Sequence, residues 1–197
     1  MRTDNRQRSV LLFGKSQKIV DDAVDDLRGL GYKAYGTNDF FSDVAKRYDL
    51  ALIDLVVLGG QVPPDRKSQL RAEFAAANPD VIFVESLLGI PGVIVVQVRG
   101  AFHNVHHDDA EAPGFTPVDR AIRLTVASTS RVKVIAWWRT SYEGPDPESD
   151  SLVLLDEDLA AGDHTIPISD QIPRSFSFAT VEVGSDQFYA LSVATEQ

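Results

Sequence analysis

The apolar residues of this 197-residue chain change their spacing near residue 119, and this change limits the folds that the chain can adopt. Before it, short apolar runs alternate with stretches whose apolar residues recur every three or four positions, which is typical of a parallel sheet with helices on both faces. After it, apolar and polar residues alternate one by one, which is typical of antiparallel strands with one buried face. We therefore expect an α/β plus all-β protein, with an α/β domain over residues 1–107, a linker over 108–118 and a small β-sandwich over 119–197.

The α/β half is expected to alternate strands with helices. Ser16 can cap a helix that Gly31 ends, and the pair Pro63-Pro64 can open another. Residues 91–106 fit either a helix that begins at Pro91 or a strand that turns back antiparallel. A parallel strand is excluded, because only about eight residues separate this segment from the previous strand and a parallel crossover needs a dozen or more. We favour the helix, because proline is well placed at its first position. The expected strands are 9–13, 32–35, 50–58 and 81–84, the expected helices 16–30, 38–47, 64–77 and 91–106, and the later strands 122–126, 131–139, 152–155, 164–168, 176–183 and 187–193.

The formal charge of −10 lies entirely in the second half of the chain. Residues 1–100 carry 13 basic and 13 acidic side chains, whereas residues 101–197 carry 6 basic and 16 acidic ones. An anionic half repels phosphate backbones and the neutral half has no basic stripe, so we expect no nucleic-acid partner. The absence of cysteine excludes disulfides, thiolate metal sites and cysteine nucleophiles. The polar start of the chain and the lack of an apolar run of about 18 residues favour a cytoplasmic protein with no membrane contact.

Small and polar residues follow three of the expected strands of the α/β half. They would meet at the carboxyl edge of the sheet, where ligands of such sheets bind. Glycines permit close approach of a ligand and a helix N-terminus favours an anion, so a small anion or a nucleotide is the candidate ligand. The competing interpretation, which we weight higher, is that Gly59-Gly60 is a tight turn; a P-loop is excluded because its first glycine is replaced by Ser9. The candidate ligand-binding residues at this edge are Gly14, Lys15, Ser16, Gly59, Gly60, Glu85 and Ser86.

Two segments carry a resemblance to a known family: the strand 10–13 with the helix after it, and the run 48–60. Over about residues 9–105 the chain resembles the receiver domains of bacterial two-component systems, and more loosely other flavodoxin-like folds. The resemblance implies that Asp54, at the end of the third strand, is the candidate phosphate acceptor. The acidic pair that holds magnesium in receivers is replaced here by residues 14–16, so the resemblance is to a degenerate receiver. Asp54 can alternatively begin the strand 55–58, which would separate it from the strand-end residues.

Histidines and acids suggest two metal sites. His103, His106 and His107 would share one side of a helix, as ligands of a metal ion do, although cations in the last turn also complement the helix dipole. Carboxylates between residues 142 and 159 could hold calcium, but no EF-hand spacing is present and we favour a solvated acidic loop. Trp137, Arg139 and Tyr142 form a candidate patch that either binds a partner or packs against the first domain.

The sequence contains no nucleophile elbow and no nucleophile–base pair that we can assemble. Our leading hypothesis is therefore a non-catalytic regulatory or assembly protein, with a phosphorylation-deficient receiver-like domain and an immunoglobulin-like β-sandwich that contacts a protein partner or a second copy. The alternative is an enzyme or a small-anion- or nucleotide-binding protein that uses the strand-end pocket. The whole chain also resembles uncharacterised two-domain bacterial proteins through the turn 59–64 and the strand 78–84, a likeness that implies no activity and no cofactor.

Overall fold

The computed structural model describes residues 6–86, 89–104, 112–141, 146–173 and 177–193. The chain divides into two compact units, Met1–Val98 and Arg99–Gln197. The first contains a parallel sheet with helices and the second contains antiparallel sheets, so the expected combination of an α/β part and a β part is confirmed. Each unit is described here by itself.

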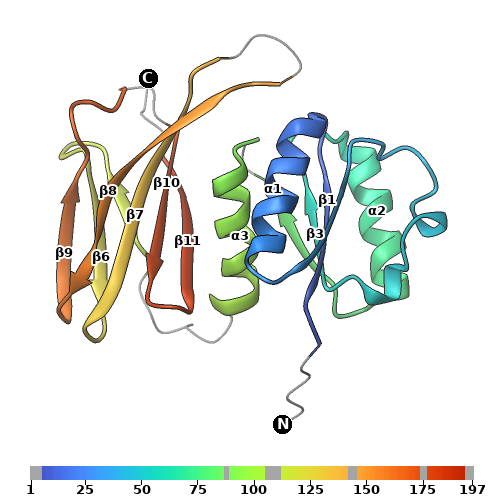
Figure 1. Ribbon diagram of the computed structural model, residues 1–197, viewed down its shortest axis with the longest axis horizontal. Coiled ribbons are helices and arrows are strands. Elements are labelled where there is room, and N and C mark those ends of the chain that lie inside the picture. The colour runs from blue at the N-terminus through green and yellow to red at the C-terminus, as the bar shows by residue number, and fades with distance from the viewer. Residues whose placement is uncertain (1–5, 87–88, 105–111, 142–145, 174–176, 194–197) are drawn as a thin grey trace. The chain divides into compact units, whose positions relative to one another are not determined.

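The α/β unit is built on a four-stranded parallel sheet with the order β2-β1-β3-β4. Its strands are β1 (Ser9–Phe13), β2 (Lys33–Thr37), β3 (Leu55–Leu58) and β4 (Ile82–Glu85). Helix α1 (Gln17–Gly29) connects β1 to β2, and α2 (Pro64–Ala77) connects β3 to β4. Figure 1 shows α1 and α2 on opposite faces of this sheet. Both connections are long enough to return the chain to the start of a parallel strand.

Strand β1 is buried on both faces, and its side chains divide between the two helices. Leu11 and Phe13 lie in a core cluster with Leu70 and Phe74 of α2, where the rings of Phe13 and Phe74 meet edge to face at 6.2 Å. The other face meets α1, whose buried residues recur at helical spacing: Ile19, Val20, Ala23, Val24 and Leu27. An apolar run with little alternation is what a strand covered on both faces requires.

Two expected elements of this unit differ in the structure. The helix expected over 38–47 is wrong: the segment holds only a 3-10 turn, Val44–Lys46, because Asp39 accepts hydrogen bonds from the N–H (3.2 Å) and hydroxyl (2.5 Å) of Ser42 and fixes a turn instead. The strand expected over 50–58 is also too long. It begins with a 3-10 turn, Leu50–Leu52, and the strand itself is only Leu55–Leu58.

Helix α3 (Pro91–His103) confirms the helical interpretation of the segment after β4. Its β-branched residues Val93, Ile94, Val95 and Val96 are all buried, so burial outweighs their weak helix propensity. The boundary between the compact units falls inside this helix, between Val98 and Arg99, whereas the sequence suggested a boundary in the segment 108–118. Residues 108–111 of that segment lie outside the described residues.

The β unit contains two antiparallel sheets. Three strands form the sheet β5-β6-β9, and four form the sheet β11-β10-β7-β8. The bounds are β5 (Gly114–Thr116), β6 (Ala121–Val126), β7 (Ser130–Arg139), β8 (Ser149–Leu159), β9 (Gly162–Pro167), β10 (Phe178–Val183) and β11 (Gln187–Ser192). The strand expected over 152–155 is thus much longer than its apolar residues indicated, because exposed acids extend it at both ends.

One core serves both sheets of the β unit. Ile122 and Leu124 of β6 are buried in the same cluster as Val132 and Val134 of β7 and Val181 of β10. Each of these strands contributes every second residue, so the strict alternation in the sequence reports the buried face correctly. No helix within the described residues is long and apolar enough to cross a membrane.

Candidate functional site

The carboxyl edge of the parallel sheet brings together residues that follow β1, β3 and β4. The N–H of Gly59 donates to the carbonyl of Phe13 (2.8 Å), and the N–H of Ser86 donates to the carbonyl of Leu58 (3.0 Å). Gly14 and Gly60 complete the edge: a Cβ on Gly60 would lie 3.7 Å from the carbonyl oxygen of Ser86. The strand-end residues expected to gather there are therefore neighbours in the fold.

Gly59 is required by the close approach of two backbones. A Cβ at this position would lie 2.7 Å from the carbonyl oxygen of Phe13 and 3.2 Å from the Cα of Gly14. Gly14 is constrained in a similar way, since its Cβ would lie 2.8 Å from a methyl carbon of Val20 on α1. These glycines let the chain approach itself, which gives them a role in the fold that needs no ligand.

Ser16 and Lys15 stand at the start of α1. The hydroxyl of Ser16 accepts a hydrogen bond from the N–H of Ile19 at 3.2 Å, so Ser16 is the N-cap that the sequence predicts. The side chain of Lys15 is exposed, and the first turn of the helix holds no acidic residue. The helix dipole and this lysine give the corner a positive potential.

Glu85 forms ion pairs with two residues of helix α2. Its carboxylate oxygens lie 3.0 Å from Nζ of Lys67 and 2.8 Å from a guanidinium nitrogen of Arg71. The hydrogen bonds from Lys67 and then Arg71 lower the pKa of Glu85 below its ordinary value. A carboxylate with two cations at its oxygens is held ionised and is a poor proton donor. Glu85 therefore fastens β4 to α2.

Asp54 lies at the opposite edge of the sheet from the other candidates. It precedes β3, and the strand between Asp54 and Gly59 separates them by roughly 16 Å at ~3.3 Å per residue. The placement of Asp54 at the end of a strand is wrong, and the alternative, that it begins the strand, is correct. The apolar run 50–58 misled the sequence interpretation because its first turn is helical.

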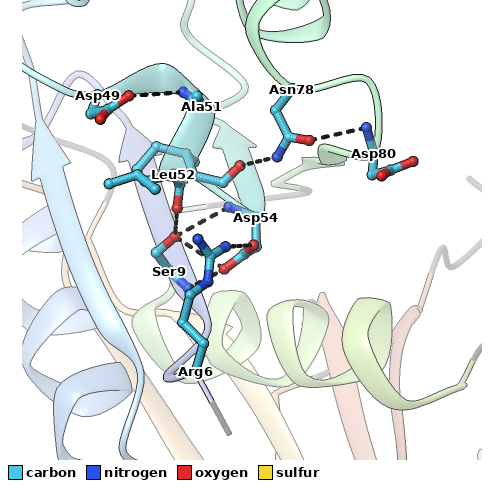
Figure 2. A network of polar contacts seen from close by, with 9 residues as sticks. Arg6, Ser9, Asp49, Ala51, Leu52, Asp54, Asn78 and Asp80 are labelled. Atoms are coloured by element: carbon cyan, nitrogen blue, oxygen red, sulfur yellow. Dashed lines mark hydrogen bonds and ion pairs between the residues drawn. The ribbon is translucent and has the colours of Figure 1, made fainter. Parts of the chain in front are cut away.

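The carboxylate of Asp54 has partners of its own at the amino edge (Figure 2). It accepts from the backbone N–H of Ser9 at 2.7 Å and from the Ser9 hydroxyl at 3.1 Å, and it forms an ion pair with Arg6 at 2.5 Å. The backbone of Asp54 also bridges two strands, donating to Ser9 and accepting from Ile82 at 2.9 Å. Asp54 thus aligns the starts of β1, β3 and β4.

Asn78 is a second polar residue of this edge that sequence reasoning missed. Its amide donates to the carbonyl of Ile53 at 2.8 Å, and its oxygen accepts from the N–H of Asp80 at 3.1 Å (Figure 2). Asn78 ends α2 and leads into β4, a position where the side chain can complete a turn. The Asn-Pro pair at 78–79 is the sequence signal that could have identified it.

A depression of about 470 Å³ also lies in the α/β unit, lined by Phe41, Ser42, Asp43, Ala45, Leu50, Arg66 and Glu73. Arg66 is its one cation among the described residues, and the side chain is only 10% exposed. Its guanidinium donates to the carbonyl of Phe40 (2.5 Å) and forms an ion pair with Glu73 (2.8 Å). Arg66 therefore anchors the loop after β2 to α2, and its charge is already compensated.

The histidine and carboxylate candidates form no metal site within the described residues, where no three His, Asp or Glu side chains converge. His103 lies in the last turn of α3, with its ring edge-on to Phe188 at a centroid distance of 5.5 Å. His106 and His107 lie outside the described residues. Of the acids expected in a loop, Asp150, Asp156, Glu157 and Asp158 lie along β8 instead.

Trp137 of the candidate patch on β7 is hydrogen-bonded to a neighbouring strand of its own sheet. The indole N–H of Trp137 donates to the hydroxyl of Thr180 at 2.9 Å, and Thr180 is 1% exposed. Trp137 and Arg139 are both half-buried, and Tyr142 lies outside the described residues. Trp137 thus joins β7 to β10 on the face of the sheet turned away from the shared core.

The chain was compared with protein-family models and with curated proteins, and neither comparison gave a match.

Proposed function

We propose that this chain is a non-catalytic regulatory or assembly protein, in which a degenerate receiver-like α/β domain is joined to an immunoglobulin-like β-sandwich that contacts a protein partner. The observation that carries the proposal is the position of Asp54. Its carboxylate is bound by Ser9 and Arg6 at the amino edge, about one strand length from the carboxyl edge. A phosphate acceptor needs an accessible carboxylate beside a magnesium site, because the metal neutralises the transferring group.

The other strand-end residues support the same conclusion. Gly59 serves a backbone contact, Ser16 caps α1, and Glu85 is paired with two cations of α2. Three of the candidates at this edge therefore have structural roles that need no ligand. An α/β domain whose polar residues serve its own fold in this way is suited to contact a protein partner rather than to carry out a reaction.

The experiment is incubation of the full chain with magnesium and a low-molecular-weight phosphodonor, followed by intact-mass analysis. We expect the mass to stay unchanged. An acid-labile phosphoryl group mapped to Asp54 and lost in Asp54→Asn would refute the proposal. The variant Asp39→Asn is a matched control, since it removes one carboxylate from the same unit at an exposed turn.

A second candidate function is the binding of a small anion at the start of α1. The exposed Lys15 beside a helix N-terminus without acidic residues favours it. A ligand that binds only the folded chain raises its melting temperature, so thermal-shift measurements with inorganic phosphate, nucleotides and flavins test it. Stabilisation that disappears in Lys15→Ala but persists in Lys46→Ala would support this function. Gly59 is not a suitable position for the test, because its substitution disturbs the fold itself.

A further inference from the structure

We propose that the outer edge of β8 binds a basic, extended segment of a partner protein as an added β-strand. This inference rests on the proposed function, because it names the chemistry of the partner that the β unit would contact. Strand addition uses the unpaired backbone groups of an edge strand for affinity and the side chains beside them for specificity.

The β unit has four edge strands, and three of them are poor templates. Strand β5 is only three residues long, and β9 ends in Pro167, which has no N–H to donate. Strand β11 is covered at Phe188, where the Asn104 side chain donates to the carbonyl (2.7 Å) and accepts from the N–H (3.0 Å). Gly100 lies so close that a Cβ would be 2.5 Å from the carbonyl oxygen of Phe188.

The Asn104 contact closes the edge of β11 in a specific way. The N–H and C=O of one residue in an antiparallel strand point to the same side, so both groups of Phe188 point away from β10. The side-chain amide of Asn104 therefore occupies the donor and the acceptor that an added strand would use. Arg99 adds to the cover, since its guanidinium lies 3.7 Å from the centre of the Phe188 ring.

Strand β8 is the remaining edge and is the longest strand of the unit, with 11 residues. It pairs with β7 on one side, and no further strand of the described chain pairs with it on the other. Seven of its residues are exposed, including Val153, which is 52% exposed at the middle of the strand. A bulge opposite Val134 and Ile135 divides β8 into two regular stretches around Leu154.

The charge of β8 selects the kind of strand that can pair with it. Asp156, Glu157 and Asp158 are consecutive and exposed, so carboxylates stand on both faces of the strand. One cation compensates them among the described contacts of β8: Arg131 bonds to Asp156 at 2.9 Å, and both side chains are about half exposed. A second copy of β8 added to this edge would bring like charges together, which disfavours self-pairing.

The partner that fits is therefore an extended segment in which lysine or arginine alternates with aliphatic residues. Asp156 and Asp158 share one face of β8, so the cations of such a segment would meet these two carboxylates and its aliphatic side chains would lie on the opposite face, beside Leu155. The N–H of Ser151 already donates to the Asp150 carboxylate at 2.7 Å, so the stretch after the bulge, residues 155–159, is the one open to pairing and a short peptide is a sufficient ligand.

The test uses the full chain and a decapeptide that alternates lysine and valine, labelled for fluorescence anisotropy at low salt. We expect saturable binding, with amide NMR shifts along β8 and not along β11. The variant Asp156→Asn/Glu157→Gln/Asp158→Asn should raise the Kd about tenfold, since each exposed ion pair contributes modestly. The control Asp21→Asn/Asp25→Asn/Asp26→Asn removes the same charge from α1 and should leave the Kd unchanged.

Two further peptides separate strand addition from simple charge attraction. A peptide N-methylated at alternate residues keeps its charge but loses main-chain donors, and a glutamate–valine peptide reverses the charge; neither should bind. Equal binding of the N-methylated peptide, shifts confined to other strands, or no binding of the lysine peptide would overturn the inference. So would a salt-sensitive dimer of the unmodified chain through β8. None of these results bears on the phosphorylation of Asp54, so the proposed function is tested separately.

Discussion

Gly59→Ala should destabilise the α/β unit because the added methyl group has no space. Its Cβ would lie 2.7 Å from the carbonyl oxygen of Phe13, an atom held in the backbone of a fully buried strand. The same position donates the 2.8 Å hydrogen bond from Gly59 to Phe13, so relief of the clash must stretch that bond or move β1. Overpacking of this kind costs about 1–3 kcal/mol, partly offset by the ~0.4–1 kcal/mol that alanine gains by restricting the unfolded chain. We expect a net loss of about 1–2 kcal/mol in the free energy of unfolding.

The assay is urea unfolding followed by far-ultraviolet circular dichroism, which reports α1 and α2. Gly60→Ala is the matched control, because its Cβ would be 3.7 Å from its nearest neighbour, an ordinary contact. The control should leave the unfolding midpoint nearly unchanged or slightly higher. Equal midpoints for the two variants would refute the assignment of Gly59 to the fold, and ligand binding would again become the reason for the glycine pair.

Three further substitutions test individual contacts. Arg99→Ala should lower the stability of the β unit by about 2 kcal/mol in urea unfolding followed by tryptophan fluorescence, because it leaves the four-fifths-buried Glu182 without its 2.6 Å partner. Trp137→Phe should lower the free energy of unfolding by about 1–2 kcal/mol, measured by circular dichroism, since it removes the indole N–H that donates to the buried hydroxyl of Thr180. Glu85→Gln should destabilise the chain at neutral pH and lose this effect in acid. The pKa of Glu85 is lowered in the folded state, so its contribution is present above the ordinary glutamate pKa of about 4.3 and disappears as pH falls through the lowered value.

Each of these expectations has a result that contradicts it. Arg123→Ala removes an exposed ion pair with Asp119 and should change stability little, so a loss as large as that of Arg99→Ala would show that burial does not decide the effect. An unchanged unfolding midpoint for Trp137→Phe would mean that the indole of Trp137 makes no stabilising hydrogen bond to Thr180. A difference between Glu85→Gln and the unmodified chain that persists in strong acid would mean that packing, and not charge, explains the loss.

The sequence predicted the elements whose pattern is local. Helix α1 has a serine cap and five buried residues at helical spacing, and β7 alternates buried and less buried residues from Val132 to Ala136. Helix α3 was predicted in spite of its β-branched residues, because the connection from β4 is too short for a parallel strand and Pro91 suits the first position of a helix.

The failures came from features that the spacing of apolar residues does not report. The bonds from Ser42 to Asp39 replace an expected helix by a turn, and apolarity alone did not separate the helical turn at residues 50–52 from β3. The error at Asp54 followed from the second of these. The roles of Asn104 and Arg66 depend on residues 84 and 26 positions away, which no local pattern reports.

The absence of a working phosphate acceptor is tested most directly by NMR of the full chain with magnesium and beryllium trifluoride, which mimics phosphate on an aspartate. We expect unchanged amide signals for Asp54, Gly59 and Ser86, because Asp54 is bonded to Ser9 and Arg6 and lies at the opposite edge of the sheet from the other two. Saturable shifts at these three amides, absent in Asp54→Asn, would contradict this expectation and would establish a functional phosphate acceptor.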